Sequence, residues 1–340
     1  MDYLQVLEQA RPVVGKVCKA CPVCNGRACG NKMPGPGAKG SGDTAIRNYE
    51  KWQAIRVNLD TLAGAATIDT KLNLFGRNFA YPFFAAPVGA VQLHYGEKYT
   101  DESYNNILVS ACAGSGIAAF TGDGVDSRVM LAATKAIKKV QGLGIPTVKP
   151  WNMETILEKL QLVKASGAFA VAMDVDAAGL PFLKNMLPAA GPKSVEELQE
   201  IVKAAEVPFI VKGIMTAKGA VKAKEAGAAG IVISNHGGRV LDQCLATAEV
   251  LPGIVAAVKG QIKIFVDGGI RSGVDIFKAL ALGADAVLIA RPFVTAVYGA
   301  GAEGVAVYVK KLAGELEDTM TMCGARTLQE ITPEMISLPK

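Results

Sequence analysis

Hydrophobic residues between positions 80 and 290 gather in eight short runs, and each run is separated from the next by a longer segment that contains Lys and Glu. Short apolar runs are typical of strands buried on both faces, and the segments between them have a helical composition. Eight such strand–helix steps predict an α/β fold, the (β/α)8 or TIM barrel. The predicted strands are 83–86, 117–120, 146–148, 170–173, 209–211, 230–233, 264–266 and 286–289.

An open, doubly wound sheet is the alternative for this pattern. Such a sheet normally carries a G-x-G-x-x-G motif after its first strand, and the segment Phe83-Phe-Ala-Ala-Pro-Val-Gly89 lacks it. Several predicted helices end in Ala-Gly or Leu-Gly just before the next strand, as at Gly227 and Gly283, which fits the preference for glycine just past a helix end. We therefore favour the closed barrel.

Polar residues cluster at the carboxyl ends of the predicted strands. In a (β/α)8 barrel these ends converge on one pocket. Charged groups in this number are costly to bury without ligands and partners, so we expect a cavity that binds a small anionic substrate or cofactor. The residues are Pro87, Val88, Gly89, Thr121, Gly122, Asp123, Gly124, Lys149, Asp174, Asp176, Lys212, Ser234, His236, Arg239, Asp267, Gly268, Gly269, Arg271, Ala290 and Arg291.

The segment Ser234-Asn-His-Gly-Gly-Arg239 breaks the apolar pattern directly after the sixth strand. His236 is one of only two histidines in 340 residues. An imidazole with a pKa of about 6.5 can accept a proton at cellular pH, and the guanidinium of Arg239 can pair with a carboxylate through two hydrogen bonds. The pair suits proton abstraction from a bound acid. The alternative is a His and an Arg that only cap the strand.

The seventh and eighth strands lead into Asp267-Gly-Gly-Ile-Arg271 and Ala290-Arg291. Glycine amides near a helix start, together with two arginines, form a phosphate cradle, and these two loops are the usual phosphate site of the fold. The alternative reading is that the glycines serve tight turns and that the arginines form surface salt bridges.

Near the N-terminus, residues 1–16 have the pattern of a short amphipathic helix, and four cysteines follow, Cys18, Cys21, Cys24 and Cys29. Two successive C-x-x-C steps and a fourth cysteine could place four thiolates around one tetrahedral centre, so we expect a Zn²⁺ or an iron–sulfur cluster here. A redox-active or free-thiol role and an accident of composition are the alternatives. The glycine-rich segment 34–42 then reads as a flexible linker, which we favour over a flap across the barrel mouth.

The composition excludes several other classes of protein. With 50% hydrophobic and 20% charged residues the chain is globular, and its net charge of +5 without a dense Lys/Arg run gives no reason to expect nucleic acid. Met1–Ala10 lacks the apolar core of a signal peptide, and no stretch of about 18 uncharged apolar residues occurs. We expect a soluble, cytoplasmic protein with no membrane partner. The odd count of seven cysteines argues against a disulfide framework.

The segment Ser234–Arg239, with Leu241-Asp242 behind it, resembles the signature of the FMN-dependent 2-hydroxy-acid oxidase and dehydrogenase family, which includes the glycolate and lactate oxidases. The resemblance extends from about Leu59 to Ile331. We therefore expect an FMN-binding barrel over residues 59–340, preceded by a Cys-rich extension over residues 1–58. Relatives commonly form tetramers, which implies a homo-oligomer.

The resemblance also implies roles for individual residues. His236 would be the catalytic base, and Asp176 the carboxylate that hydrogen-bonds it and stabilises its imidazolium form. Lys212 would lie beside the N1/O2 edge of the flavin, with a salt bridge to Asp174 or Asp176 as its structural alternative. The catalytic set is then His236, Asp176, Lys212 and Arg239.

For the cofactor, the resemblance implies that Asp267 binds the ribityl chain and that Gly269, Arg271 and Arg291 hold the FMN phosphate. The strand-one segment at Pro87 would lie against the flavin. The complete expected set for FMN is Pro87, Val88, Gly89, Thr121, Lys149, Lys212, Ser234, His236, Gly237, Arg239, Asp267, Gly268, Gly269, Arg271, Ala290 and Arg291.

The chain departs from the family where the substrate carboxylate would bind. A second arginine is expected near Leu183, a tyrosine is expected in the 34–42 loop, and a tyrosine and a glutamine are expected where Val148-Lys149-Pro150-Trp151 stands. Lys149 could restore a positive charge but not the phenolic hydrogen bond.

Three functions are therefore open. The first is FMN-dependent oxidation of a small, lactate-like or glycolate-like 2-hydroxy acid to the 2-oxo acid. The second is flavin-dependent isomerisation of the isopentenyl diphosphate type, and the third is a flavin- or metal-binding redox sensor that responds through the cysteines.

Overall fold

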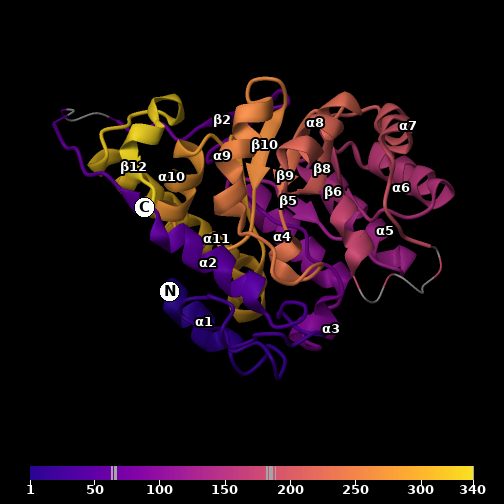
Figure 1. The fold of residues 1–340 in the computed structure, drawn as a ribbon. Coiled ribbons are helices and arrows are strands. Elements are labelled where there is room, and N and C mark those ends of the chain that lie inside the picture. Colours follow the sequence, from indigo (N-terminus) through magenta and orange to yellow (C-terminus); the bar gives the residue numbers. More distant parts are fainter. Residues whose placement is uncertain (63, 65–66, 181–182, 184–186, 188, 340) are drawn as a thin grey trace.

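Eight parallel strands close into one barrel, in the order β10-β11-β4-β5-β6-β7-β8-β9 (Figure 1). The computed structural model describes residues 1–62, 64, 67–180, 183, 187 and 189–339. Each predicted strand overlaps an observed one, so the predicted (β/α)8 barrel is confirmed. The barrel strands are β4 (Phe83–Ala85), β5 (Ala119–Thr121), β6 (Gly144–Val148), β7 (Val171–Asp174), β8 (Phe209–Ile214), β9 (Gly230–Ile233), β10 (Lys263–Val266) and β11 (Ala286–Ile289).

Helices between the strands cover the outside of the barrel. Several begin at a side chain that accepts a backbone N–H of the first turn, as Ser194 does from Glu197, which satisfies an amide that the helix itself leaves unpaired. The helices are α3 (Val91–Tyr95), α4 (Asp101–Gly114), α5 (Ser127–Lys139), α6 (Met153–Ser166), α7 (Val195–Ala205), α8 (Ala217–Glu225), α9 (Thr247–Val258), α10 (Gly273–Ala281) and α11 (Arg291–Met322), with 3-10 turns η1 (Val175–Gly179), η2 (His236–Gly238), η3 (Leu328–Glu330) and η4 (Pro333–Met335).

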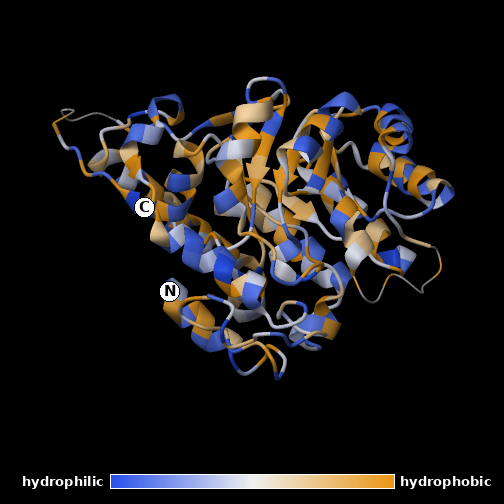
Figure 2. Cartoon of the chain, in the orientation of Figure 1, coloured by the Kyte–Doolittle hydropathy of each residue, from blue (hydrophilic) through white to orange (hydrophobic). Residues whose placement is uncertain are grey.

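The barrel interior is filled by aromatic and branched side chains. The rings of Phe84, Phe120 and Phe265 lie 6.0 to 6.5 Å apart between centroids, and all three residues are fully buried. Beneath them, the hairpin of β2 (Leu72–Leu74) and β3 (Arg77–Phe79) brings Phe79 edge-on against Phe84 at 5.0 Å. Figure 2 shows mainly hydrophobic residues on the central strands, whereas the outer helices carry both hydrophobic and hydrophilic residues. Because the core and the β2–β3 hairpin fill the end of the barrel where the strands begin, a ligand must enter at the end where the strands finish.

The N-terminal segment packs against the end of the barrel where the strands finish (Figure 1). Helix α1 (Tyr3–Ala10) stops earlier than the predicted 1–16, because Pro12 cannot donate to a continuing helix. Tyr3 stacks on Tyr308 of α11 with centroids 4.6 Å apart. Helix α2 (Asp43–Ala54) then leads to β1 (Arg56–Val57), which pairs with β12 (Ile336–Ser337). Among the described residues, no helix combines the length and the apolar character needed to cross a membrane.

Candidate active site

A cavity of about 410 Å³ opens at the carboxyl ends of the barrel strands. Its volume lies within the range of small-molecule and cofactor sites, roughly 300–1,000 Å³. Every residue that the sequence predicted for cofactor binding lines this cavity except Thr121 and Ser234. Ser234 lies directly behind the wall, where its Oγ accepts hydrogen bonds from Lys212 Nζ and from the His236 amide, both at 3.1 Å. The barrel therefore brings the predicted residues to one place.

His236 and Asp176 form a hydrogen-bonded pair at this end of the barrel. His236 Nδ1 lies 3.1 Å from Asp176 Oδ1. The backbone of His236 has a φ of +57°, a conformation that non-glycine residues rarely adopt, and it begins the tight turn η2. Asp176 packs against Gly213, where a Cβ atom would stand 2.5 Å from the carboxyl carbon. Gly213 lies at a register shift between β8 and β9, so this irregularity makes room for the carboxylate.

The charges around His236 keep it neutral and Asp176 ionised. Burial lowers the pKa of His236 and the Lys212 ammonium lowers it further; Asp176 opposes both, and the pKa stays below its usual 6.5. Burial raises the pKa of Asp176, but Lys212 and His236 outweigh burial and bring it below its usual value. The imidazole can therefore act as a base at neutral pH, with an anion beside it to stabilise the proton that it gains.

Lys212 is a buried cation that lies among carboxylates. Its Nζ lies 3.7 Å from Asp267 and 3.1 Å from the Ser234 hydroxyl. Burial lowers the pKa of Lys212, but Asp176, Asp267 and Asp174 outweigh it and leave the pKa above its usual value. The carboxylate nearest to Lys212 is thus Asp267, whereas the structural alternative considered from the sequence was a salt bridge to Asp174 or Asp176.

Asp174 instead pairs with Lys149. The Lys149 Nζ lies 2.5 Å from Asp174 Oδ2, and both side chains are nearly or fully buried. Next to them, the buried carboxylate of Asp123 accepts hydrogen bonds from Lys159 Nζ and Trp151 Nε1, both at 2.7 Å. Lys149 therefore lines the cavity with its positive charge already paired with Asp174, which lies on the neighbouring strand.

The glycine-rich segment 34–42 covers Arg239, so the prediction of a flexible linker is wrong. Arg239 NH1 donates to the carbonyls of Gly35 at 2.7 Å and Gly37 at 2.9 Å. The segment is also fixed from outside, where the Ser41 amide donates to Asp242 Oδ2 at 2.7 Å. This packing could not be predicted from the sequence, because a backbone carbonyl can pair with a guanidinium whatever side chain the residue carries.

His94, the other histidine, lies beside Arg239 and was missed by the sequence analysis. Its Nε2 is 3.3 Å from Arg239 NH2, and the Gly35 amide donates to its Nδ1 at 3.0 Å. Burial, helped by the positive charge of Arg239, lowers the pKa of His94 to about 4, so the ring is neutral. The rarity of histidine in the chain was the one available signal.

Helix α2 supplies a second contact that the sequence did not indicate. Asn48 and Asn235 exchange side-chain amide hydrogen bonds of 2.8 and 3.0 Å, and Trp52 Nε1 donates to the Gly268 carbonyl at 2.8 Å. Residues 43–54 thus hold two of the turns that line the cavity, those after β9 and β10. Nothing in the local pattern of α2 distinguishes it from an ordinary surface helix.

The cavity carries a polar group that needs a partner. Asp267 lines the cavity, and its Oδ1 is buried and has no hydrogen-bond partner within the described part of the chain. Buried polar atoms in native proteins are almost always paired. Gly268 and Gly269 adopt φ angles of +84° and +86°, which lets the backbone after β10 turn tightly beside the cavity. A polar ligand with hydroxyl groups would satisfy Asp267 Oδ1, and FMN has such groups.

The two arginines expected at the FMN phosphate lie together at one side of the cavity. Arg291 NH2 donates to the Gly237 carbonyl at 2.8 Å, and Arg271 Nε donates to the Cys24 carbonyl at 2.6 Å. The Cys-rich segment thus reaches the predicted phosphate site. Among the described residues, no three of the cysteine sulfur atoms lie within 4.8 Å of one another; the one group of potential metal ligands that close together is Asp174, Asp176 and His236.

A comparison with protein families matches most of the chain. A model described as FMN-dependent dehydrogenase matches residues 36–185 and 182–338. Among curated proteins, the chain is 30% identical over 335 residues to 4-hydroxymandelate oxidase of Amycolatopsis orientalis, a match that covers 89% of this chain and 94% of that protein. It is 48% identical over 140 residues to the peroxisomal (S)-2-hydroxyacid oxidase GLO3 of Arabidopsis thaliana, covering 41% of this chain but only 38% of that protein.

Solved structures show the same architecture. Mandelate oxidase with (S)-2-phenylpropionate superposes with a TM-score of 0.81 at 27% identity, covering 99% of this chain and 97% of that chain. A mandelate oxidase mutant with an FMN adduct superposes with a TM-score of 0.78 at 26% identity, covering 96% of both chains. The family match and this adduct support FMN as the cofactor. The named relatives act on different acids, so the comparisons do not identify a substrate.

Proposed function

Because the chain belongs to the FMN-dependent dehydrogenase family, we propose that it binds FMN and oxidises a small 2-hydroxy acid to the 2-oxo acid. The observation that carries the proposal is the His236–Asp176 pair, with 3.1 Å between Nδ1 and Oδ1, set in the same cavity end as Lys212, Arg239 and the two arginines. This combination offers a base, an anion to support the base, and cations for a carboxylate and a phosphate.

When bound, FMN supplies a two-electron acceptor, which no side chain of the protein provides. Oxidation removes two protons and two electrons from the substrate, and His236 accepts one of the protons. Asp176 keeps the ring oriented through Nδ1, and its charge stabilises the imidazolium that forms. Since the pKa of His236 lies below 6.5, the base is free at neutral pH.

Lys212 holds a positive charge near the cofactor region of the cavity. The carboxylates of Asp176, Asp267 and Asp174 raise the pKa of Lys212 and keep the ammonium protonated, and Nζ donates to the Ser234 hydroxyl at 3.1 Å. A fixed buried cation stabilises negative charge that develops next to it much more than water would, because it needs no reorganisation during the reaction. Arg271 and Arg291 would hold the phosphate, and Asp267 Oδ1 would accept from a ribityl hydroxyl.

Arg239 is the group that we propose for the substrate carboxylate. It lines the cavity, but its NH1 already donates to two loop carbonyls, so its remaining donors are what a carboxylate could use. Leu180 and Leu183 lie on the cavity wall in the region where the family's second arginine is expected; neighbouring positions in that loop fall outside the described residues. An apolar wall favours a substrate with a small apolar side chain, such as lactate, over glycolate.

The test is an anaerobic titration of the purified flavoprotein with L-lactate, glycolate and mandelate, followed through the flavin absorbance. We expect L-lactate to bleach the flavin faster than glycolate, and His236→Asn to retain FMN while reduction by substrate is lost. A chain that binds FMN but is bleached by none of these acids, or a His236→Asn variant reduced at the wild-type rate, would contradict the proposal.

We also propose that the protein acts in the cytoplasm as a homo-oligomer, and that the assembly is the tetramer implied by the family resemblance. Light scattering coupled to size-exclusion chromatography tests the assembly, and a monomer at micromolar concentration would contradict it. Fractionation of the native cells tests the location.

A further inference from the structure

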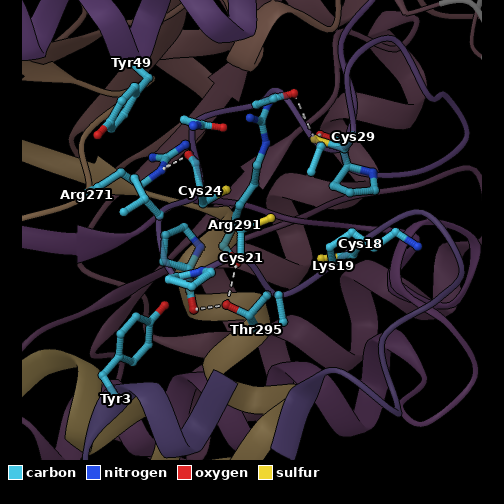
Figure 3. A pocket seen from close by; sticks show the side chains of 18 of the residues that line it. Tyr3, Cys18, Lys19, Cys21, Cys24, Cys29, Tyr49, Arg271, Arg291 and Thr295 are labelled. Atoms are coloured by element: carbon cyan, nitrogen blue, oxygen red, sulfur yellow. Dashed lines mark hydrogen bonds between the residues drawn. The ribbon is translucent and has the colours of Figure 1, made fainter. Parts of the chain in front are cut away.

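A second cavity, of about 200 Å³, lies directly beside the first, and all four N-terminal cysteines line it (Figure 3). Arg271 and Arg291 line both cavities, so the two arginines form the boundary between them. Figure 3 shows Cys24 next to Arg271, with Cys18, Cys21 and Cys29 around the same space. The oxidation proposed above uses none of these thiols.

The segment that carries the thiols is fixed in the fold. Arg271 Nε donates to the Cys24 carbonyl at 2.6 Å, and the buried Cys29 donates through Sγ to the Gly26 carbonyl at 3.5 Å. Tyr3 and Tyr308, stacked at 4.6 Å, close another side of the cavity. Four cysteines from one short segment thus line one partly open cavity, whose other walls come from α1, α2, α3, α11 and the turn after β10.

The size of the space argues against a single metal ion. A tetrahedral Zn²⁺ with Zn–S bonds of about 2.3 Å requires sulfur atoms about 3.8 Å apart. No three of the four sulfur atoms, all of them in the described part of the chain, meet even within 4.8 Å. A cavity of about 200 Å³ also exceeds the roughly 30 Å³ that one water molecule occupies several times over. An iron–sulfur cluster binds each thiolate to a different iron atom, so it needs both the wider spacing and the larger space.

The charge around the cavity fits an anionic ligand. A four-iron cluster bound by four thiolates carries a net negative charge, and positive groups near such a cluster stabilise it. Arg271 and Arg291 supply two such groups at the cavity wall. We propose that Cys18, Cys21, Cys24 and Cys29 bind a four-iron, four-sulfide cluster, whose binding displaces the four thiol protons.

This cluster would also hold the phosphate site together. Arg271 is positioned by the Cys24 carbonyl, so an ordered Cys-rich segment keeps this guanidinium at the boundary of the two cavities. Loss of the cluster should loosen the segment and weaken FMN retention. This consequence rests on the proposed function, whereas the cluster itself does not.

The experiment uses the full chain, expressed with added iron and purified without oxygen. Iron, acid-labile sulfide and zinc are measured per chain, and the reduced protein is examined by electron paramagnetic resonance. We expect about four iron and four sulfide per chain, a cluster signal on reduction, and at least a twofold loss of both elements in Cys21→Ser and Cys24→Ser. Cys244→Ser, at a cysteine outside this cavity, is the matched control and should keep the wild-type content.

Several outcomes would overturn the proposal. They are one zinc per chain without sulfide, a chain that takes up neither iron nor sulfide after anaerobic reconstitution, and a Cys21→Ser variant that keeps its full iron content. If Cys24→Ser does not fold, Cys18→Ser and Cys21→Ser, whose side chains are partly exposed, give the same test. Since metal content is read without substrate, a failed cluster and a failed oxidase activity are told apart.

Discussion

Asp176→Asn is the sharpest test of the catalytic arrangement, because it removes one charge and almost no volume. Asp176 Oδ1 lies 3.1 Å from His236 Nδ1, and Lys212 lies close enough to act on both groups. In the variant the amide can still occupy the same space, but the anion that stabilises the imidazolium is gone. The positive charge of Lys212 then disfavours protonation of the His236 ring, and the Asp176 charge that opposed this effect is absent.

The magnitude follows from the distance. Two unit charges 3.1 Å apart interact with about 5 kcal/mol at an effective dielectric constant of about 20. The proton is only partly transferred in the transition state, so we take about 3–4 kcal/mol of this as lost. At about 1.4 kcal/mol for each factor of ten, the rate constant for flavin reduction should fall by roughly 10²- to 10³-fold.

The assay is anaerobic stopped-flow reduction at saturating substrate, measured across pH. Asp176 raises the pKa of His236 in the wild-type protein, so its removal should lower that pKa still further. Activity needs the neutral base and is lost as the pH falls through the pKa, so the acid limb should move to lower pH in the variant. A fall in rate of less than tenfold with an unmoved acid limb would refute the reasoning, since a structural role alone would not shift the pH profile.

Three other substitutions test further parts of the site. Arg239→Lys keeps the positive charge but loses the planar guanidinium that can donate two parallel hydrogen bonds to a carboxylate, so we expect KM to rise about tenfold or more with a smaller change in kcat. An unchanged KM would show that Arg239 does not bind the substrate. Gly269→Ala places a Cβ atom 2.2 Å from the Asn48 carbonyl at a φ of +86°, so we expect a drop in Tm and loss of FMN; wild-type values for both would contradict the close packing. Lys149→Met leaves Asp174 buried without its partner, which should destabilise the fold by about 3 kcal/mol in denaturant titration, and adding Asp174→Asn should recover part of that loss; a single variant as stable as wild type would show that the pair contributes little.

The sequence by itself determined the barrel and most of its catalytic end. Runs such as 230–233 are apolar because strands in a closed parallel barrel are buried on both faces, so local pattern and global fold carry the same signal. Once the strands were assigned, the positions of Asp176, Lys212 and His236 followed, because strand ends of a barrel must converge. The order of the strands along the chain was therefore enough to predict that these three residues lie at the same end of the barrel.

Tertiary structure alone decided the contacts between segments that no periodicity links. The linker expected at 34–42 packs on Arg239, and its glycines gave no hint because it is their backbone carbonyls that accept the hydrogen bonds of the guanidinium. His94 contacts Arg239, which lies 145 positions further along the chain, and Cys24 contacts Arg271, which lies 247 positions further along. The sequence pattern shows which local structure each segment prefers. Whether two distant segments contact each other depends on how all the elements between them pack, and this is determined only in the folded chain.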